Sequence, residues 1–204
     1  MNLKKLKSYE KQFFMRYPGG FENPEMQEIA KKHKMPKMMD FVKSTFAKQN
    51  FDDVELLIAN FTKLVGQSSM VSVFEKAKLR DHLKSMYHED KQILCQGLYQ
   101  LLHGKMQLGF EIIIDQLEKV KLAKWTILTA LPVYYKPKKE YFIKPTTVKK
   151  IIHNFELDLV YKPLPSWSFY KNIRSHLDQM KKQVDARLSP SNAAFTGFLM
   201  MTME

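Results

Sequence analysis

The chain has 204 residues, of which 45% are hydrophobic and 26% are charged, as is ordinary for a soluble globular protein of one domain. No run approaches the roughly 18 apolar residues of a transmembrane helix, so we expect no membrane contact. The single cysteine, Cys95, excludes an internal disulfide and favours a cytoplasmic location. The net charge of +12 is unevenly distributed along the chain. Residues 1–120 contain 19 basic and 15 acidic residues, whereas residues 121–204 contain 14 basic and 6 acidic residues.

Residues 1–120 predict a helical body. An apolar stripe that begins at Leu3 ends at residues 17–20 (Tyr-Pro-Gly-Gly), because proline fixes φ and glycine permits a positive φ. Asn23 followed by Pro24 is typical of an N-cap and the first helical position. Pro36 can open the next helix. Apolar residues at helical spacing predict four more helices, over residues 53–65, from Ser69 or Ser72 to His88, over 90–103 with Gly104 as its end, and over 110–120.

The character of the chain changes after residue 121. Residues 125–131 are almost wholly apolar and stop at Pro132, which predicts a segment buried on all sides. Five prolines between residues 132 and 165 exclude a long helix there. Residues 141–143 and 159–161 are short and β-prone, and they could pair as a two-stranded β-ribbon around a helix over residues 146–155.

Two further helices complete the expected fold. Ser166 is typical of an N-cap and predicts an amphipathic helix through about Arg187. Residues 189–191 (Ser-Pro-Ser) open a last apolar segment over residues 193–203. The expected fold is therefore mainly α: a single domain over 1–204, with a helical body over 1–120 and a basic, aromatic subregion over 121–204.

Lysines alternate with aromatic residues and prolines between residues 134 and 182. Positive charge beside planar side chains is typical of a surface that receives an anionic polymer. A helix that starts near Thr146 also offers free N–H groups and hydroxyls to phosphate. The predicted nucleic-acid-binding residues are Lys138, Lys139, Lys144, Thr146, Thr147, Lys149, Lys150, Lys171 and Arg174.

The same tract has a structural interpretation, in which its tyrosines and its tryptophan pack inward. About a dozen residues separate its two helices, whereas a standard helix-turn-helix motif has a turn of three or four. A second functional hypothesis is a protein-interaction or scaffold component. The chain has 13 methionines, whose flexible thioethers suit adaptable interfaces. Its predicted contact surface comprises Trp167, Tyr170, Met200 and Met201.

An enzyme is the least supported class. The histidines form no HExxH motif, and Cys95 lies on an apolar helical stripe, so we predict no metal, no cofactor and no catalytic residue. Glu75, Lys76 and Asp81 have the residue types of a Mg²⁺-dependent nuclease. They fall within one predicted helix, however, where such pairs are usual on the surface.

Several short phrases also resemble a bacterial family of uncharacterised soluble proteins. They are, in order, residues 17–21 (YPGGF), 74–76 (FEK), 79–81 (LRD), 124–126 (KWT), 142–146 (FIKPT), 165–167 (PSW) and 188–190 (LSP). The resemblance covers nearly the whole chain and implies a bacterial origin and a single domain. It implies no activity.

Overall fold

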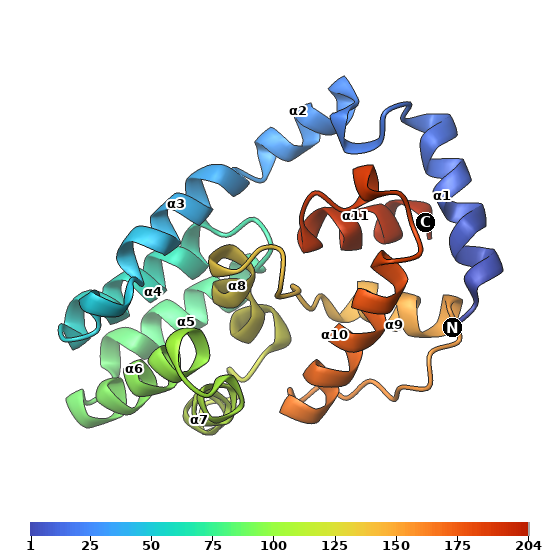
Figure 1. Ribbon diagram of the computed structural model, residues 1–204. Helices are drawn as coiled ribbons and strands as arrows, with labels where there is room; N and C mark the ends of the chain where they lie inside the picture. Colours follow the sequence, from blue (N-terminus) through green and yellow to red (C-terminus); the bar gives the residue numbers. More distant parts are fainter. Residues whose placement is uncertain (204) are drawn as a thin grey trace.

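Eleven α-helices and three short 3-10 helices make up the regular structure of residues 1–203, which a computed structural model describes (Figure 1). The mainly α fold is confirmed. The α-helices are α1 (Leu3–Arg16), α2 (Pro24–Lys32), α3 (Met35–Thr45), α4 (Val54–Gln67), α5 (Val73–Ser85), α6 (His88–His103), α7 (Met106–Glu118), α8 (Trp125–Tyr135), α9 (Pro145–Asn154), α10 (Trp167–Lys181) and α11 (Asn192–Thr202). The 3-10 helices are Gly20–Glu22, Lys48–Asn50 and Ala186–Leu188.

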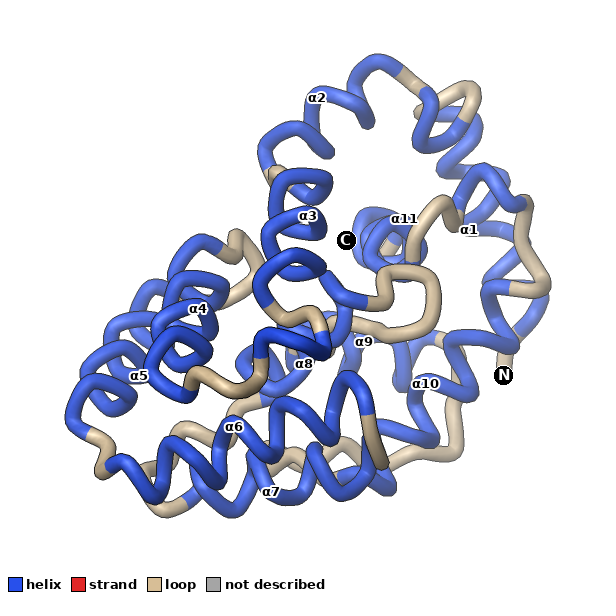
Figure 2. Tube along the Cα trace, turned by 60° about the vertical axis from the view of Figure 1, so that its left-hand side comes forward, coloured by secondary structure: helices blue, strands red, loops and turns tan. Residues whose placement is uncertain are grey.

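The predicted β-ribbon is wrong, since no part of the described chain is in a strand (Figure 2). Two backbone donors of residues 141–143 bond to side chains of neighbouring helices. The N–H of Tyr141 donates to the hydroxyl of Tyr170 (3.2 Å). The N–H of Ile143 donates to the hydroxyl of Thr129 (3.0 Å). A segment whose donors are satisfied in this way has no need of a partner strand.

Local capping signals place most helix starts correctly. Asn23 accepts from the N–H of Glu25, with Pro24 at the first helical position. Ser72, rather than Ser69, caps α5, and a capping box with Glu75 reinforces it. The helix predicted to run through His88 ends at Ser85, and the next helix, predicted over residues 90–103, already begins at His88. Likewise, α10 ends at Lys181, short of the predicted end near Arg187.

Helix α8 lies at the centre of the molecule (Figure 1). All its residues from Trp125 to Tyr134 are buried, which confirms the core prediction. The predicted stop at Pro132 is wrong, since the helix continues to Tyr135. A proline inside a helix costs about 3 kcal/mol through its missing N–H and a steric clash. Burial of the helix on every side offsets that cost. The sequence around Pro132 does not reveal that the helix continues past the proline.

Helices α6 and α7 run side by side as the most closely packed pair of the fold. Two glycines permit this contact. A Cβ on Gly109 would lie 2.2 Å from the backbone N of Leu101 and 2.5 Å from the carbonyl O of Gly97. A Cβ on Gly97 would lie 2.9 Å from a methyl carbon of Ile112. The two backbones therefore approach more closely than any side chain at Gly109 would allow.

The first three helices form an arch around α11 (Figure 1). We call residues 3–45 the N-terminal arch. Its two ends are anchored: α1 packs on α11 through the rings of Phe13 and Phe198 (5.3 Å between centroids), and α3 packs on α8. Between them, α2 spans the top of the arch and buries only one of its own residues, Met26. Helix α2 therefore covers a space that its own side chains do not fill.

No helix within residues 1–203 has the length and apolar character needed to cross a membrane.

Candidate functional site: an apolar cleft beneath the N-terminal arch

The predicted nucleic-acid-binding residues divide into two groups. Lys138, Lys139, Lys144, Thr146, Lys149, Lys150 and Lys171 are exposed. None of these lysines has a carboxylate within 4.0 Å in the described part of the chain. Thr147 is buried, and Arg174 is committed to an internal ion pair.

Arg174 and Tyr170 share one buried carboxylate, that of Glu140. Arg174 Nη1 donates to both oxygens, at 3.1 and 2.8 Å, and the Tyr170 hydroxyl donates to Glu140 Oε2 at 2.9 Å. Burial, together with the nearby Glu140 charge, raises the pKa of Tyr170 well above its ordinary value. This network connects Glu140, in the segment between α8 and α9, to two residues of α10.

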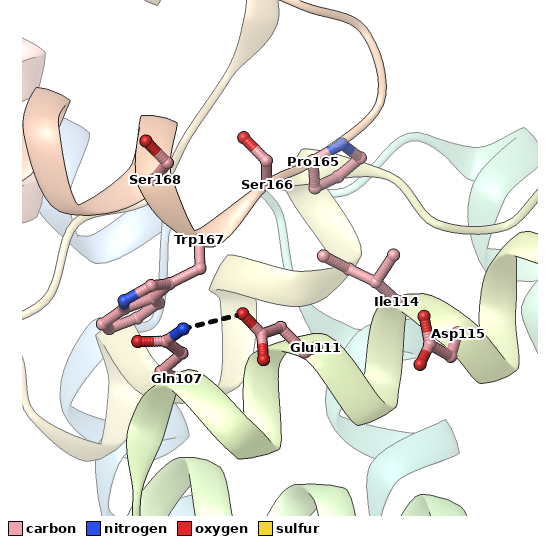
Figure 3. A pocket seen from close by; sticks show the side chains of 8 residues that line it. All are labelled: Gln107, Glu111, Ile114, Asp115, Pro165, Ser166, Trp167 and Ser168. Atoms are coloured by element: carbon pink, nitrogen blue, oxygen red, sulfur yellow. Dashed lines mark hydrogen bonds between the residues drawn. The ribbon is translucent and has the colours of Figure 1, made fainter.

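Tyr170 also belongs to the aromatic core. It is fully buried and its ring stacks on that of Phe110, with centroids 5.3 Å apart. Trp167 is half-buried and lines an open depression between α7 and α10 (Figure 3). Met200 and Met201 lie elsewhere, on α11. The structure therefore does not bring the four residues of the predicted interaction surface together.

The depression at Trp167 has a volume of about 350 Å³ and two carboxylates, Glu111 and Asp115 (Figure 3). Gln107 Nε2 donates to Glu111 Oε1 at 2.9 Å. Residues 1–203 contain no group of three or more potential metal ligands, here or elsewhere. At the residues with nuclease-like types, the Glu75 carboxylate accepts from the N–H and hydroxyl of Ser72, and Asp81 pairs with Arg80.

A much larger cleft, of about 800 Å³, opens beneath the N-terminal arch, and we call it the arch cleft. Its walls come from α2 and the start of α3, from the loop between α4 and α5, from α9, and from α11. The lining is predominantly apolar. Its apolar members include Phe21, Met26, Ile29, Ala30, Met35, Met70, Phe142, Val148, Ile151, Ala194, Met200 and Met201.

Methionine is prominent in this lining. Met26, Met35, Met70, Met200 and Met201 come from four separate segments and meet around one space. Unbranched thioether side chains adapt their shape to a ligand more readily than branched ones. The sequence analysis selected Met200 and Met201 but missed the other three. Their one signal was the high number of methionines in the chain, which does not indicate where they meet.

Helix α9 contributes a cation and a hydroxyl to the cleft, whose lining also includes polar residues of other segments. Lys144 is its N-cap residue and Pro145 occupies the first turn. Lys144, Thr147, Val148 and Ile151 all line the cleft. The free N–H groups of a first helical turn carry a partial positive charge. The start of α9 therefore places a cation next to backbone donors in the wall of the arch cleft.

The other basic side chains of the lining, and His33, have partners of their own. Lys31 pairs with Glu28, and Arg187 pairs with Asp185 at 2.8 Å. Hydrogen bonds from Arg187 lower the pKa of the Asp185 carboxyl to about 2. His33 Nδ1 lies 2.9 Å from the hydroxyl of Ser69. Lys144 differs from these groups because no carboxylate of residues 1–203 lies within 4.0 Å of it.

The arch cleft thus combines a mostly apolar lining with polar side chains from several segments, a combination that is common at small-molecule sites. The resemblance to a bacterial family stays a prediction. Comparison of the chain with protein-family models, with curated proteins and with solved structures finds no match.

Proposed function

We propose that this protein is a binding protein whose arch cleft takes up a small apolar ligand. The observation that carries the proposal is the cleft itself, with about 800 Å³ of mostly apolar, methionine-lined space. Small-molecule sites usually have volumes of about 300–1,000 Å³ and apolar linings with few polar groups. Each Å² of apolar surface removed from water stabilises a complex by about 25 cal/mol.

The architecture around the cleft supports this proposal. Helix α2 is held at its ends and buries only Met26, so its apolar face lacks the packed neighbours that most helices have. Ile29, on the same helix, is exposed and lines the cleft. A bound apolar molecule would cover these side chains and fill the space that the fold leaves.

Filling the arch cleft with a side chain should prevent binding. Gly197 lies on α11 and lines the cleft, and a Cβ added there meets no atom within 4 Å. We expect Gly197→Leu to weaken binding of N-phenyl-1-naphthylamine, an uncharged apolar fluorophore, at least tenfold. The fluorescence of the probe, titrated with protein, measures the effect.

Gly66→Leu is the matched control for this experiment. Gly66 is also helical, on α4, and a Cβ there also meets no atom within 4 Å, but it does not line the cleft. Both variants should gain helix propensity, by less than about 1 kcal/mol. Saturable binding by the wild type and by Gly66→Leu alone would support the proposal. Equal binding by all three proteins, or none by the wild type, would count against it.

A second candidate function is contact with nucleic acid, as the sequence analysis predicts. The specific observation is that Lys138, Lys139, Lys144, Lys149, Lys150 and Lys171 are exposed without a carboxylate partner in the described chain. Phosphate contacts by such lysines would supply most of the affinity and little sequence specificity.

Charge reversal tests this second candidate. We expect the wild type to bind a labelled 25-mer duplex or its single strand, with affinity that falls at least tenfold between about 50 and 200 mM salt. Lys149→Glu with Lys150→Glu should lower the salt slope by about 2. Fluorescence anisotropy measures both. Lys78→Glu with Lys84→Glu makes the same charge change on α5, so an equal effect would show that net charge alone is responsible.

A further inference from the structure

We infer that the ligand of the arch cleft is an amphipathic anion, an unbranched acyl chain that ends in a carboxylate. Its carboxylate would bind Lys144 and the first turn of α9, and its chain would lie against the methionines of α2 and α11. This inference rests on the proposed apolar-ligand function and specifies the chemical class of the ligand.

Lys144 is the first observation in its favour. It lines the cleft, is exposed, and has no carboxylate within 4.0 Å anywhere in residues 1–203. Glu22 is the one acidic side chain among the lining residues. The charge of Glu22 acts on Arg187, whose guanidinium pKa it helps Asp185 to raise. The cation of Lys144 thus remains available to a ligand.

Thr147 is the second, independent observation. Its side chain is part of the cleft lining although the residue is only 7% exposed, and its hydroxyl makes no hydrogen bond within the described residues. The Thr147 hydroxyl is therefore free to form a hydrogen bond with a polar ligand atom, as donor or as acceptor. Thr147 lies one turn from Lys144, so a single head group can reach both.

The α9 backbone adds donors at the same place. The N–H groups of Thr146 and Thr147 belong to the first turn, where the helix itself supplies no acceptor, and Lys144 offers no side-chain cap. This turn also carries the positive end of the helix dipole. A carboxylate has two acceptor oxygens, which suits a lysine together with a hydroxyl or an N–H.

The rest of the cleft favours an extended hydrocarbon chain. Val148 and Ile151 continue from Lys144 along α9, and Met26, Met200 and Met201 complete the apolar surround. Lys144 is the one basic side chain of the lining without a carboxylate partner among residues 1–203, so an anionic head group has one preferred position. The lining holds three basic side chains, Lys31, Lys144 and Arg187, against the one carboxylate of Glu22. The cleft and the net charge of +12 would therefore disfavour a cationic amphiphile.

Isothermal titration calorimetry with three twelve-carbon ligands tests the inference. Dodecanoate, dodecanol and dodecyltrimethylammonium share a chain and differ in head-group charge, and each is used below its micelle concentration. We expect dodecanoate to bind at least tenfold more tightly than dodecanol, and the cation more weakly than either. Shortening the acid to decanoate should weaken binding about fourfold per methylene.

Three variants locate the head group. Lys144→Met keeps an apolar stem without the charge, and it should remove the preference for dodecanoate while leaving dodecanol unchanged. Thr147→Val should reduce that preference about three- to tenfold. Lys150→Met, on the same helix but outside the cleft lining, should bind like the wild type.

The outcomes separate this inference from the function on which it rests. Equal binding of dodecanoate and dodecanol, or a preference that survives Lys144→Met, would overturn the carboxylate inference and leave an apolar-ligand protein. Tighter binding of the cation would overturn it as well. Failure of all three ligands together with N-phenyl-1-naphthylamine would overturn both proposals.

Discussion

Replacing Arg174 with methionine should lower the free energy of unfolding by about 3 kcal/mol. The substitution leaves the Glu140 carboxylate, whose side chain is 5% exposed, without the cation that donates to both of its oxygens. Removing one partner of a buried ion pair typically costs about 3–5 kcal/mol. We expect the lower end, because the Arg174 side chain is 28% exposed and water can partly replace it. Urea unfolding followed by circular dichroism measures the change.

Arg80→Met is the matched control, since Arg80 also pairs with a carboxylate at 2.8 Å, that of Asp81. Both of these side chains are more than 60% exposed, so the loss should be below about 1 kcal/mol. Adding Glu140→Gln to Arg174→Met should recover part of the stability by removing the unpaired charge. Equal losses for the two arginine variants would show that burial of Glu140 is not the cause.

Replacing Gly109 with alanine should cost about 3 kcal/mol, a large effect for one added methyl group. The new Cβ would lie 2.2 Å from the backbone N of Leu101 and 2.5 Å from the carbonyl O of Gly97. Backbone atoms cannot rotate away as a flexible side chain can, so α6 and α7 would have to separate. Overpacking of a core usually costs about 1–3 kcal/mol, and separation of this pair belongs at the upper end.

Thermal unfolding distinguishes this effect from helix propensity. Gly197→Ala makes the same substitution on α11, where a Cβ meets no atom within 4 Å. It should gain about 0.5–1 kcal/mol, because alanine favours a helix more than glycine does. In a chain of this size 1 kcal/mol shifts the Tm by about 2–4 °C. A Gly109→Ala protein as stable as Gly197→Ala would contradict the close approach of α6 and α7.

Sequence-based prediction succeeded where the signal is local. Asn23, Ser72, Ser166 and Ser191 each accept a hydrogen bond from the first turn of the helix that follows. A capping residue acts over three positions, so the chain itself reveals it. The β-ribbon prediction failed because the donors of residues 141 and 143 bond to Tyr170 and Thr129, far away along the chain.

The candidate site was predicted only in pieces. Lys144, Thr147, Met200 and Met201 were all selected, but the lysine and the threonine were assigned to nucleic acid and the methionines to a protein partner. The structure gathers them around one cleft. Similarly, the sequence does not distinguish an arginine that would contact phosphate from Arg174, which is paired with Glu140. The grouping of the cleft residues and the pairing of Arg174 both depend on which helix faces meet in the fold. No local sequence pattern encodes those contacts.

The packing of α1 on α11 has a consequence for the order of folding. Phe13 and Phe198 come from the first and last helices, so closing this contact joins nearly the whole described chain into one loop. Such distant contacts form late, because their loop-closure entropy must be met before they contribute stability. On the ribosome, a chain that extends only through α10 lacks one wall of the cleft. The arch cleft is therefore incomplete until α11 has been synthesised and packed, and until then the apolar face of α1 lacks the helix that covers it.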